Sequence, residues 1–130
     1  MNIRQEIRVP SLAEPLSHYT DAVRCGDTLY ISGIAPLDDE GHVVGEGDVV
    51  AQTHQVFANM APILAAAGMT FADVARVTVY LKDVSHRTLI NPVRQEVFGS
   101  VRPASSLIEV SDLAVPGMLV EIEAVAWREA

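Results

Sequence analysis

The chain has 130 residues, a length that fits one folded domain over residues 1–130, and it carries a formal net charge of -8. Its 9 arginines and lysines are scattered along the sequence, so we expect no nucleic-acid partner, because phosphate binding needs clustered cations. Apolar residues make up 49% of the chain, yet no apolar run approaches the roughly 20 residues that span a bilayer, so we expect a buried subunit interface and no membrane partner.

The first third of the chain predicts short β-strands. Residues 2–9 and 21–24 are candidates, and residues 28–32 (Thr-Leu-Tyr-Ile-Ser) are rich in β-forming side chains. We expect Gly33 to end this third strand.

A helix and a further strand follow. From Val49 to Ala67 the apolar residues recur at three- and four-residue spacing, which predicts a helix that Asp48 caps and Gly68 ends. Residues 74–82 then alternate aliphatic with polar or aromatic side chains, which is typical of a strand with one buried face.

The last part of the chain predicts a second helix and two strands. The helix lies between Ser85, its expected N-cap, and Gly99, and the strands cover residues 102–110 and 120–126. The order of strands, helix, strand, helix, strands predicts an α+β fold, with both helices packed on one face of a mixed sheet.

Two carboxylates lie among aliphatic residues in the last predicted strand, Glu121 and Glu123. An apolar setting raises the pKa of a carboxyl group toward the range useful for acid/base work, so Glu121 is our candidate catalytic group. The alternative is that both carboxylates pair with an arginine or lysine of a neighbouring strand or subunit, and the sequence leaves both interpretations open.

The sequence offers no metal site. The 4 histidines are far apart, no pair has the i, i+4 spacing of common metal ligands, and Cys25 is a single cysteine. The first residues, Met1 to Glu6, lack the apolar core of a signal peptide, which predicts a cytoplasmic location.

A set of short motifs extends with almost constant spacing from about Tyr19 to Trp127. The motifs are residues 30–33 (YISG), 65–68 (AAAG), 77–83 (VTVYLKD), Asn91, 102–105 (RPAS) and 121–124 (EIEA). Together they resemble the RidA/YjgF family of small imine and enamine deaminases.

The resemblance implies a chorismate-mutase-like subunit in a homotrimer around a central barrel, with three clefts between neighbouring subunits. It implies hydrolysis of a small-molecule substrate of the 2-aminoacrylate type to a 2-keto acid and ammonia, without metal or organic cofactor. Carried over by position, Glu121 and Tyr19 would be catalytic. The substrate-binding positions would be Ser32, Gly33, Asn91, Ser105 and Leu107.

One of these positions departs from the family pattern. Deaminating members grip the substrate carboxylate with an arginine where this chain has Ser105, and a hydroxyl cannot replace a bidentate guanidinium. Leu107 stands where some members have a cysteine. Arg102 is a cation nearby, but its odd spacing from Ser105 along a strand predicts that it points to the opposite face.

The sequence therefore supports two main hypotheses. The first is a cofactor-free deaminase of an imine or enamine that is anchored differently from 2-aminoacrylate, with an aminomuconate-type unsaturated amino acid as one candidate. The second is a noncatalytic protein that binds a small metabolite in the same clefts. Ribonuclease activity is disfavoured by the acidic charge.

Overall fold

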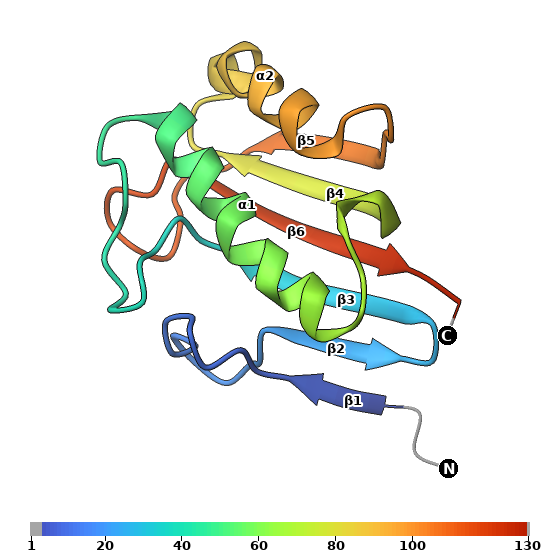
Figure 1. Ribbon diagram of the computed structural model, residues 1–130. Helices are drawn as coiled ribbons and strands as arrows, with labels where there is room; N and C mark the ends of the chain where they lie inside the picture. The colour runs from blue at the N-terminus through green and yellow to red at the C-terminus, as the bar shows by residue number, and fades with distance from the viewer. Residues whose placement is uncertain (1–3, 130) are drawn as a thin grey trace.

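The computed structural model describes residues 4–129, in which six strands form one mixed sheet of order β1-β2-β3-β6-β4-β5. Within these residues two α-helices cover one face of the sheet and leave the other face open (Figure 1). The predicted mixed sheet with two helices on one face is confirmed. The elements are β1 (Arg4–Ile7), β2 (Ala22–Cys25), β3 (Thr28–Ile34), α1 (Val49–Ala66), β4 (Val74–Leu81), α2 (Arg87–Phe98), β5 (Ala104–Glu109) and β6 (Val120–Trp127).

The strand boundaries differ from the predicted ones by one or two residues at several ends. Residues 2 and 3 of the first predicted strand lie outside the described residues. The prediction that Gly33 ends the third strand is wrong, because β3 continues to Ile34. The pairing of β3 with β6 shifts register between Ile31 and Ile34, so the chain passes Gly33 in a β-bulge and then resumes pairing.

The helix ends follow the chemistry of their caps. The Asp48 side chain accepts hydrogen bonds from two backbone N–H groups of the first turn of α1, and Gly68, with φ at +71°, follows the helix as predicted. The prediction that Ser85 caps the second helix is wrong. The Asp83 carboxylate accepts the Ser85 N–H instead and opens a short 3-10 turn, after which α2 begins at Arg87.

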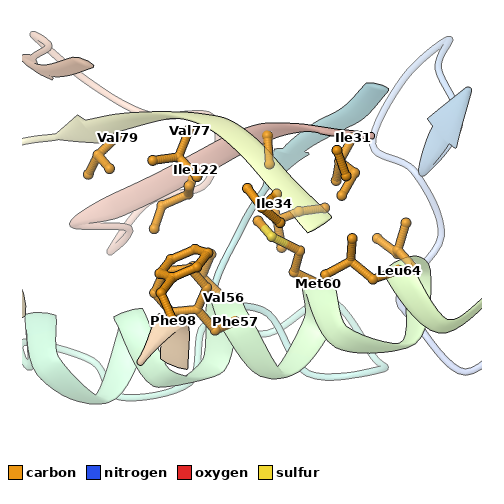
Figure 2. Packing of buried hydrophobic residues seen from close by; sticks show 14 of the residues in the cluster. Ile31, Ile34, Val56, Phe57, Met60, Leu64, Val77, Val79, Phe98 and Ile122 are labelled. Carbon is orange, nitrogen blue, oxygen red and sulfur yellow. The ribbon is translucent and has the colours of Figure 1, made fainter. Parts of the chain in front are cut away.

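The core lies between the helices and one face of the sheet. Met60 and Leu64 of α1 lie toward Ile34 and Ile31 of β3, and Val56 and Phe57 of α1 lie toward Val77 of β4 and Ile122 of β6 (Figure 2). All of these side chains are buried. Since a one-residue slip of β6 would turn its aliphatic residues away from α1, this packing sets which side chains of β6 face the other way.

Aromatic packing closes one end of the core. The rings of Phe57, Phe71 and Phe98 meet edge to face, with centroid separations of 5.9, 5.6 and 5.7 Å. Edge-to-face pairs add about 0.5–1.5 kcal/mol beyond the area that they bury. Phe57 on α1 and Phe98 on α2 thereby join the two helices (Figure 2).

The open face of the sheet is rich in large apolar side chains. Tyr30, Ile108 and Trp127 are 52%, 45% and 54% exposed there, beside the half-buried Tyr80 and Val125. Within residues 4–129, no helix is long and apolar enough to cross a membrane. This apolar face has no covering layer within the described chain.

We expect Phe57→Ala to lower the free energy of unfolding by about 3–5 kcal/mol, because it removes the ring that contacts both other phenylalanines and leaves a cavity. Urea denaturation followed by circular dichroism measures the loss. The matched control is Leu89→Ala, whose side chain is 52% exposed on α2 and should change stability by under about 0.5 kcal/mol. Equal effects of the two substitutions would contradict this account of the core.

Candidate active site

A cavity of about 390 Å³ lies where the end of β3 and the start of β6 meet the segment of residues 12–17. We call it the Glu121 cavity. Four of the predicted site residues line it together: Tyr19, Ser32, Gly33 and Glu121. They come from three separate parts of the chain, and the β3–β6 pairing brings them to one place.

Gly33 and Glu121 approach each other closely across the bulge. A Cβ atom added at residue 33 would lie 2.6 Å from the Oε2 atom of Glu121, well inside any real contact. The missing side chain of Gly33 thus makes the space that the carboxylate occupies. This is a specific reason for a glycine at this position, in place of the strand end that the sequence predicted.

The Glu121 carboxylate has no hydrogen bond or ion pair with another described residue. Burial raises the pKa of Glu121 above its usual value, and the negative charge of Glu123 raises it further. Such a group holds its proton at a higher pH than a surface glutamate does. It therefore has the properties of a general acid and base.

The neighbouring carboxylate, Glu123, has a hydrogen-bonding partner. Glu123 accepts a hydrogen bond from the Tyr80 hydroxyl across the β4–β6 pair, and this bond raises the pKa of Tyr80. No arginine or lysine of residues 4–129 forms an ion pair with Glu121 or Glu123. Within one protomer, the alternative that basic residues neutralise both carboxylates is thus not realised.

Tyr19 and Ser32 keep polar capacity for a ligand. The Tyr19 oxygen accepts the backbone N–H of Leu16 at 3.1 Å, which leaves its own proton to donate. The Ser32 hydroxyl donates to the Thr20 carbonyl at 2.6 Å, which leaves its oxygen lone pairs to accept. Tyr19 and Ser32 therefore offer a donor and an acceptor in the lining of the cavity that also holds the Glu121 carboxylate.

Sequence reasoning missed three residues that hold the walls of the Glu121 cavity. Arg8 pairs with the buried Asp21 at 2.9 Å and donates to the carbonyls of Leu12 and Ala13, which anchors the segment of residues 12–17. Asn59 of α1 donates to the Ala35 and Leu37 carbonyls. Gln52 of α1 is fully buried. Its side-chain amide donates hydrogen bonds to the Gly45 and Gly117 carbonyls and accepts one from the Leu119 N–H. Two of the three had a signal in the sequence, since Gln52 and Asn59 are polar residues within the largely apolar α1.

A second cavity, of about 440 Å³, lies between the second half of α2 and the start of β5. We call it the Arg94 cavity. Asn91 and Ser105 line it, together with Arg94 and Arg102, and it shares no lining residue with the Glu121 cavity. Leu107 lines neither cavity and packs, partly buried, against the core.

Two arginines therefore lie close to Ser105. Arg94 donates from its Nη2 atom to the Ser105 hydroxyl at 2.8 Å. Arg102 precedes β5, which begins at Ala104, so the strand alternation that predicted opposite faces does not apply to it. Arg102 lines the same cavity as Ser105.

Metal binding has no set of ligands in the described part of the chain. Among residues 4–129, no group of three or more histidine, cysteine, aspartate or glutamate side chains is placed to hold a metal ion. The polar groups that the structure brings together are instead a free carboxylate, a phenol, hydroxyls and guanidinium groups.

Comparison with known proteins relates this chain to one family. The model of the family described as endoribonuclease L-PSP matches residues 11–128. A RutC family protein of Pyrococcus horikoshii is 39% identical over 127 residues, which cover 98% of this chain and 100% of that protein. The 3-aminoacrylate deaminase RutC of Acinetobacter baylyi is 38% identical over 112 residues, covering 86% of this chain and 88% of that protein.

Solved structures agree with the sequence comparisons. The crystal structure of RidA from the Antarctic bacterium Psychrobacter sp. has a TM-score of 0.89 and 32% sequence identity, and the match covers 95% of this chain and 99% of that one. The similarity thus concerns the whole fold described above, including the strands that form the Glu121 cavity.

We expect Glu121→Gln to stabilise the protein at pH 8 and not at pH 4. The pKa of Glu121 is raised in the folded state, so ionising it costs folding free energy. That cost is absent below the pKa of the unfolded chain and complete above the folded pKa. The half-exposed carboxylate is partly screened, so the gain in Tm at pH 8 should be roughly 1–4 °C.

Differential scanning calorimetry at the two pH values measures this gain. Glu129→Gln, which neutralises an exposed carboxylate near the end of the chain, is the matched control and should leave the Tm unchanged at both. A lower Tm for Glu121→Gln at pH 8 would show that the carboxylate is stabilising and has a partner.

Proposed function

Because this chain belongs to the endoribonuclease L-PSP family, which includes RidA and RutC proteins, we propose that it is a cofactor-free hydrolytic deaminase of imines or enamines. The observation that carries the proposal is the Glu121 carboxylate, which lies unpaired in a largely apolar cavity with a raised pKa. The A. baylyi relative is named for 3-aminoacrylate, which is an enamine that bears a carboxylate.

Hydrolysis of an iminium carbon needs one water and a group that accepts and returns protons. The Glu121 carboxylate takes a proton from the water as the water oxygen bonds to carbon, which gives a carbinolamine. Glu121 then protonates the nitrogen, the C–N bond breaks with its electron pair on nitrogen, and ammonia leaves. The hydroxyl proton returns to the carboxylate as the carbonyl forms.

An enamine needs one earlier step, the addition of a proton to its carbon to form the iminium ion. Protonated Glu121 supplies this proton, and its raised pKa keeps a larger fraction protonated near neutral pH than an ordinary glutamate has. Tyr19 donates to the carbinolamine oxygen, and the Ser32 oxygen accepts from the nitrogen. These roles follow from the hydrogen-bonding capacity that each group has left.

We further propose that the protein works as a homotrimer with its substrate clefts between subunits. The apolar open face of the sheet would then be buried in a central barrel, which accounts for exposed Tyr30, Ile108 and Trp127. The Glu121 and Arg94 cavities are separate in one protomer. The RidA resemblance implies one cleft with residues from both cavities. Such a cleft would take the Glu121 cavity from one subunit and the Arg94 cavity from its neighbour.

The runner-up is a noncatalytic protein that binds a small metabolite in the same clefts. This alternative uses the same binding residues as the deaminase, and it differs because the bound metabolite is not hydrolysed. Ribonuclease activity, which the family description names, is disfavoured because the chain has a net charge of -8. The cytoplasmic location and the aminomuconate-type substrate stay predictions.

We expect the full chain to catalyse ammonia release from at least one of three substrates, at a rate above that in buffer without protein. These are freshly generated 2-aminoacrylate, 3-aminoacrylate and an aminomuconate-type unsaturated amino acid. A coupled ammonia assay gives the rate, and Glu121→Gln should lower kcat by about 10²–10⁴ because an amide cannot accept the proton. Gly33→Ala should also reduce kcat, because its Cβ displaces the carboxylate.

Glu46→Gln is the control for this assay, since it neutralises an exposed carboxylate outside the Glu121 cavity. Wild-type rates equal to buffer with all three substrates would contradict the deaminase proposal and favour the noncatalytic protein. Turnover that survives Glu121→Gln would remove Glu121 from the mechanism while leaving the activity in place.

The assembly has its own test. Light scattering at micromolar concentration should give a mass close to three times the 14.0 kDa chain. Trp127→Glu, which puts a charge on the open face of the sheet, should shift the population toward monomers because the charge would be buried in the barrel. A monomeric mass for the wild type would contradict both the trimer and the shared cleft.

A further inference from the structure

Arg94 is a half-buried cation without an anionic partner. Its described hydrogen bond goes to the neutral Ser105 hydroxyl, and the ion pairs formed within residues 4–129 do not include it. Burial lowers the pKa of Arg94 from its usual value, which reflects the cost of keeping the charge away from water. A guanidinium in such a place gains most from a ligand that carries a negative charge.

The position of Arg94 follows from the geometry of α2. Asn91, Arg94, Gln95 and Phe98 recur at three- and four-residue spacing, so they form one stripe of the helix, and all four line the Arg94 cavity. The other wall comes from residues 99–105, which include Arg102 and Ser105. The cavity therefore has two guanidinium groups and amide and hydroxyl donors around one space.

The lining of this cavity is unusual for an acidic chain. It includes two arginines and no aspartate or glutamate, although the chain has 17 acidic residues against 9 basic ones. The lining of the Glu121 cavity includes three carboxylates, of which Glu14 and Asp21 pair with Arg8, and Glu121 has no basic partner among the described residues. Together the two cavities suit a ligand with a carboxylate at one end and a group that exchanges protons with Glu121 at the other.

We propose that Arg94 binds the carboxylate of the substrate, in place of the arginine that position 105 lacks, with Ser105 positioning its guanidinium. The Ser105 hydroxyl accepts a hydrogen bond from Nη2 at 2.8 Å, which holds one corner of the planar group and leaves its other N–H donors without a partner among the described residues. The identity of the ligand as an imino or enamino acid rests on the proposed function and on the intersubunit cleft. Small 2-imino acids then belong to the substrate class despite Ser105.

A direct binding experiment tests this site without turnover. The probe is 2-oxobutanoate, and 2-butanone is its matched control because it has the same ketone and no carboxylate. NMR titration of the full-length protein should show no binding of 2-butanone and saturable binding of 2-oxobutanoate. Arg94→Gln should weaken it by roughly 10- to 100-fold, the loss expected for a charge-assisted bidentate contact.

Three further variants identify the role of the guanidinium. Arg87→Gln removes an exposed arginine of the same helix outside the cavity and should bind like the wild type. Ser105→Asp should abolish binding of 2-oxobutanoate, because the new carboxylate would pair with the Arg94 guanidinium. The double variant Arg94→Gln/Ser105→Arg should regain affinity, since it moves the guanidinium across the 2.8 Å contact to β5. This rescue places the carboxylate beside position 105, and the loss of binding in Arg94→Gln, compared with Arg87→Gln, assigns the wild-type contact to Arg94.

Kinetics separate this inference from the proposed function. Where wild-type turnover is found, Arg94→Gln should raise KM for the carboxylate substrate far more than it lowers kcat. Binding of 2-oxobutanoate through Arg94 without any ammonia release would overturn the deaminase proposal and keep the carboxylate site. Wild-type affinity in Arg94→Gln, or loss of binding in Arg102→Gln alone, would overturn the assignment to Arg94.

Discussion

The candidate active site depends on the close approach of the Glu121 carboxylate to Gly33 across the β3–β6 pair. The bulge between Ile31 and Ile34 brings a residue without a side chain to the place where Oε2 lies. The carboxylate gains a position in this way but no hydrogen-bonding partner, and burial raises its pKa. A group held in place with its lone pairs free is what water activation requires.

The sheet can carry two carboxylates without a basic partner because its other face is apolar and well packed. Ile122 and Ala124 of β6 are buried under α1, so Glu121 and Glu123 must point to the opposite side. Hydrogen bonds from Arg8, Gln52 and Asn59 then hold the loops around the cavity. The hydrophobic core therefore lies on the helix-covered face, and the Glu121 carboxylate projects from the other.

Charge is separated within the protomer. The Arg94 cavity is lined by arginines without an acidic residue, and the Glu121 cavity holds Glu121, a carboxylate that no arginine or lysine of residues 4–129 pairs with. An iminium nitrogen and a carboxylate on one small molecule match these two environments. The separation also gives a physical reason for assembly, because one protomer does not join the two cavities by itself.

Much of the fold was readable from periodicity. The apolar spacing of α1, the alternation in β4 and the capping by Asp48 were correct, because covering one face of an element imposes a repeat on the residues themselves. The start of α2 was predicted wrongly, since Asp83 and Ser85 are both good caps and the 3-10 turn decides between them. The motifs, read together, also identified the family.

The side-chain environments needed the tertiary structure. From position alone, Ser105 indicated a missing cation, whereas the packing of α2 beside the start of β5 brings the Arg94 guanidinium to the same hydroxyl. Gly33 looked like the end of a strand, and its role in making room for Glu121 depends on a bulge against a strand far along the chain. Spacing along a chain describes one element at a time, while the partner of a buried charge is set by elements that meet only after folding.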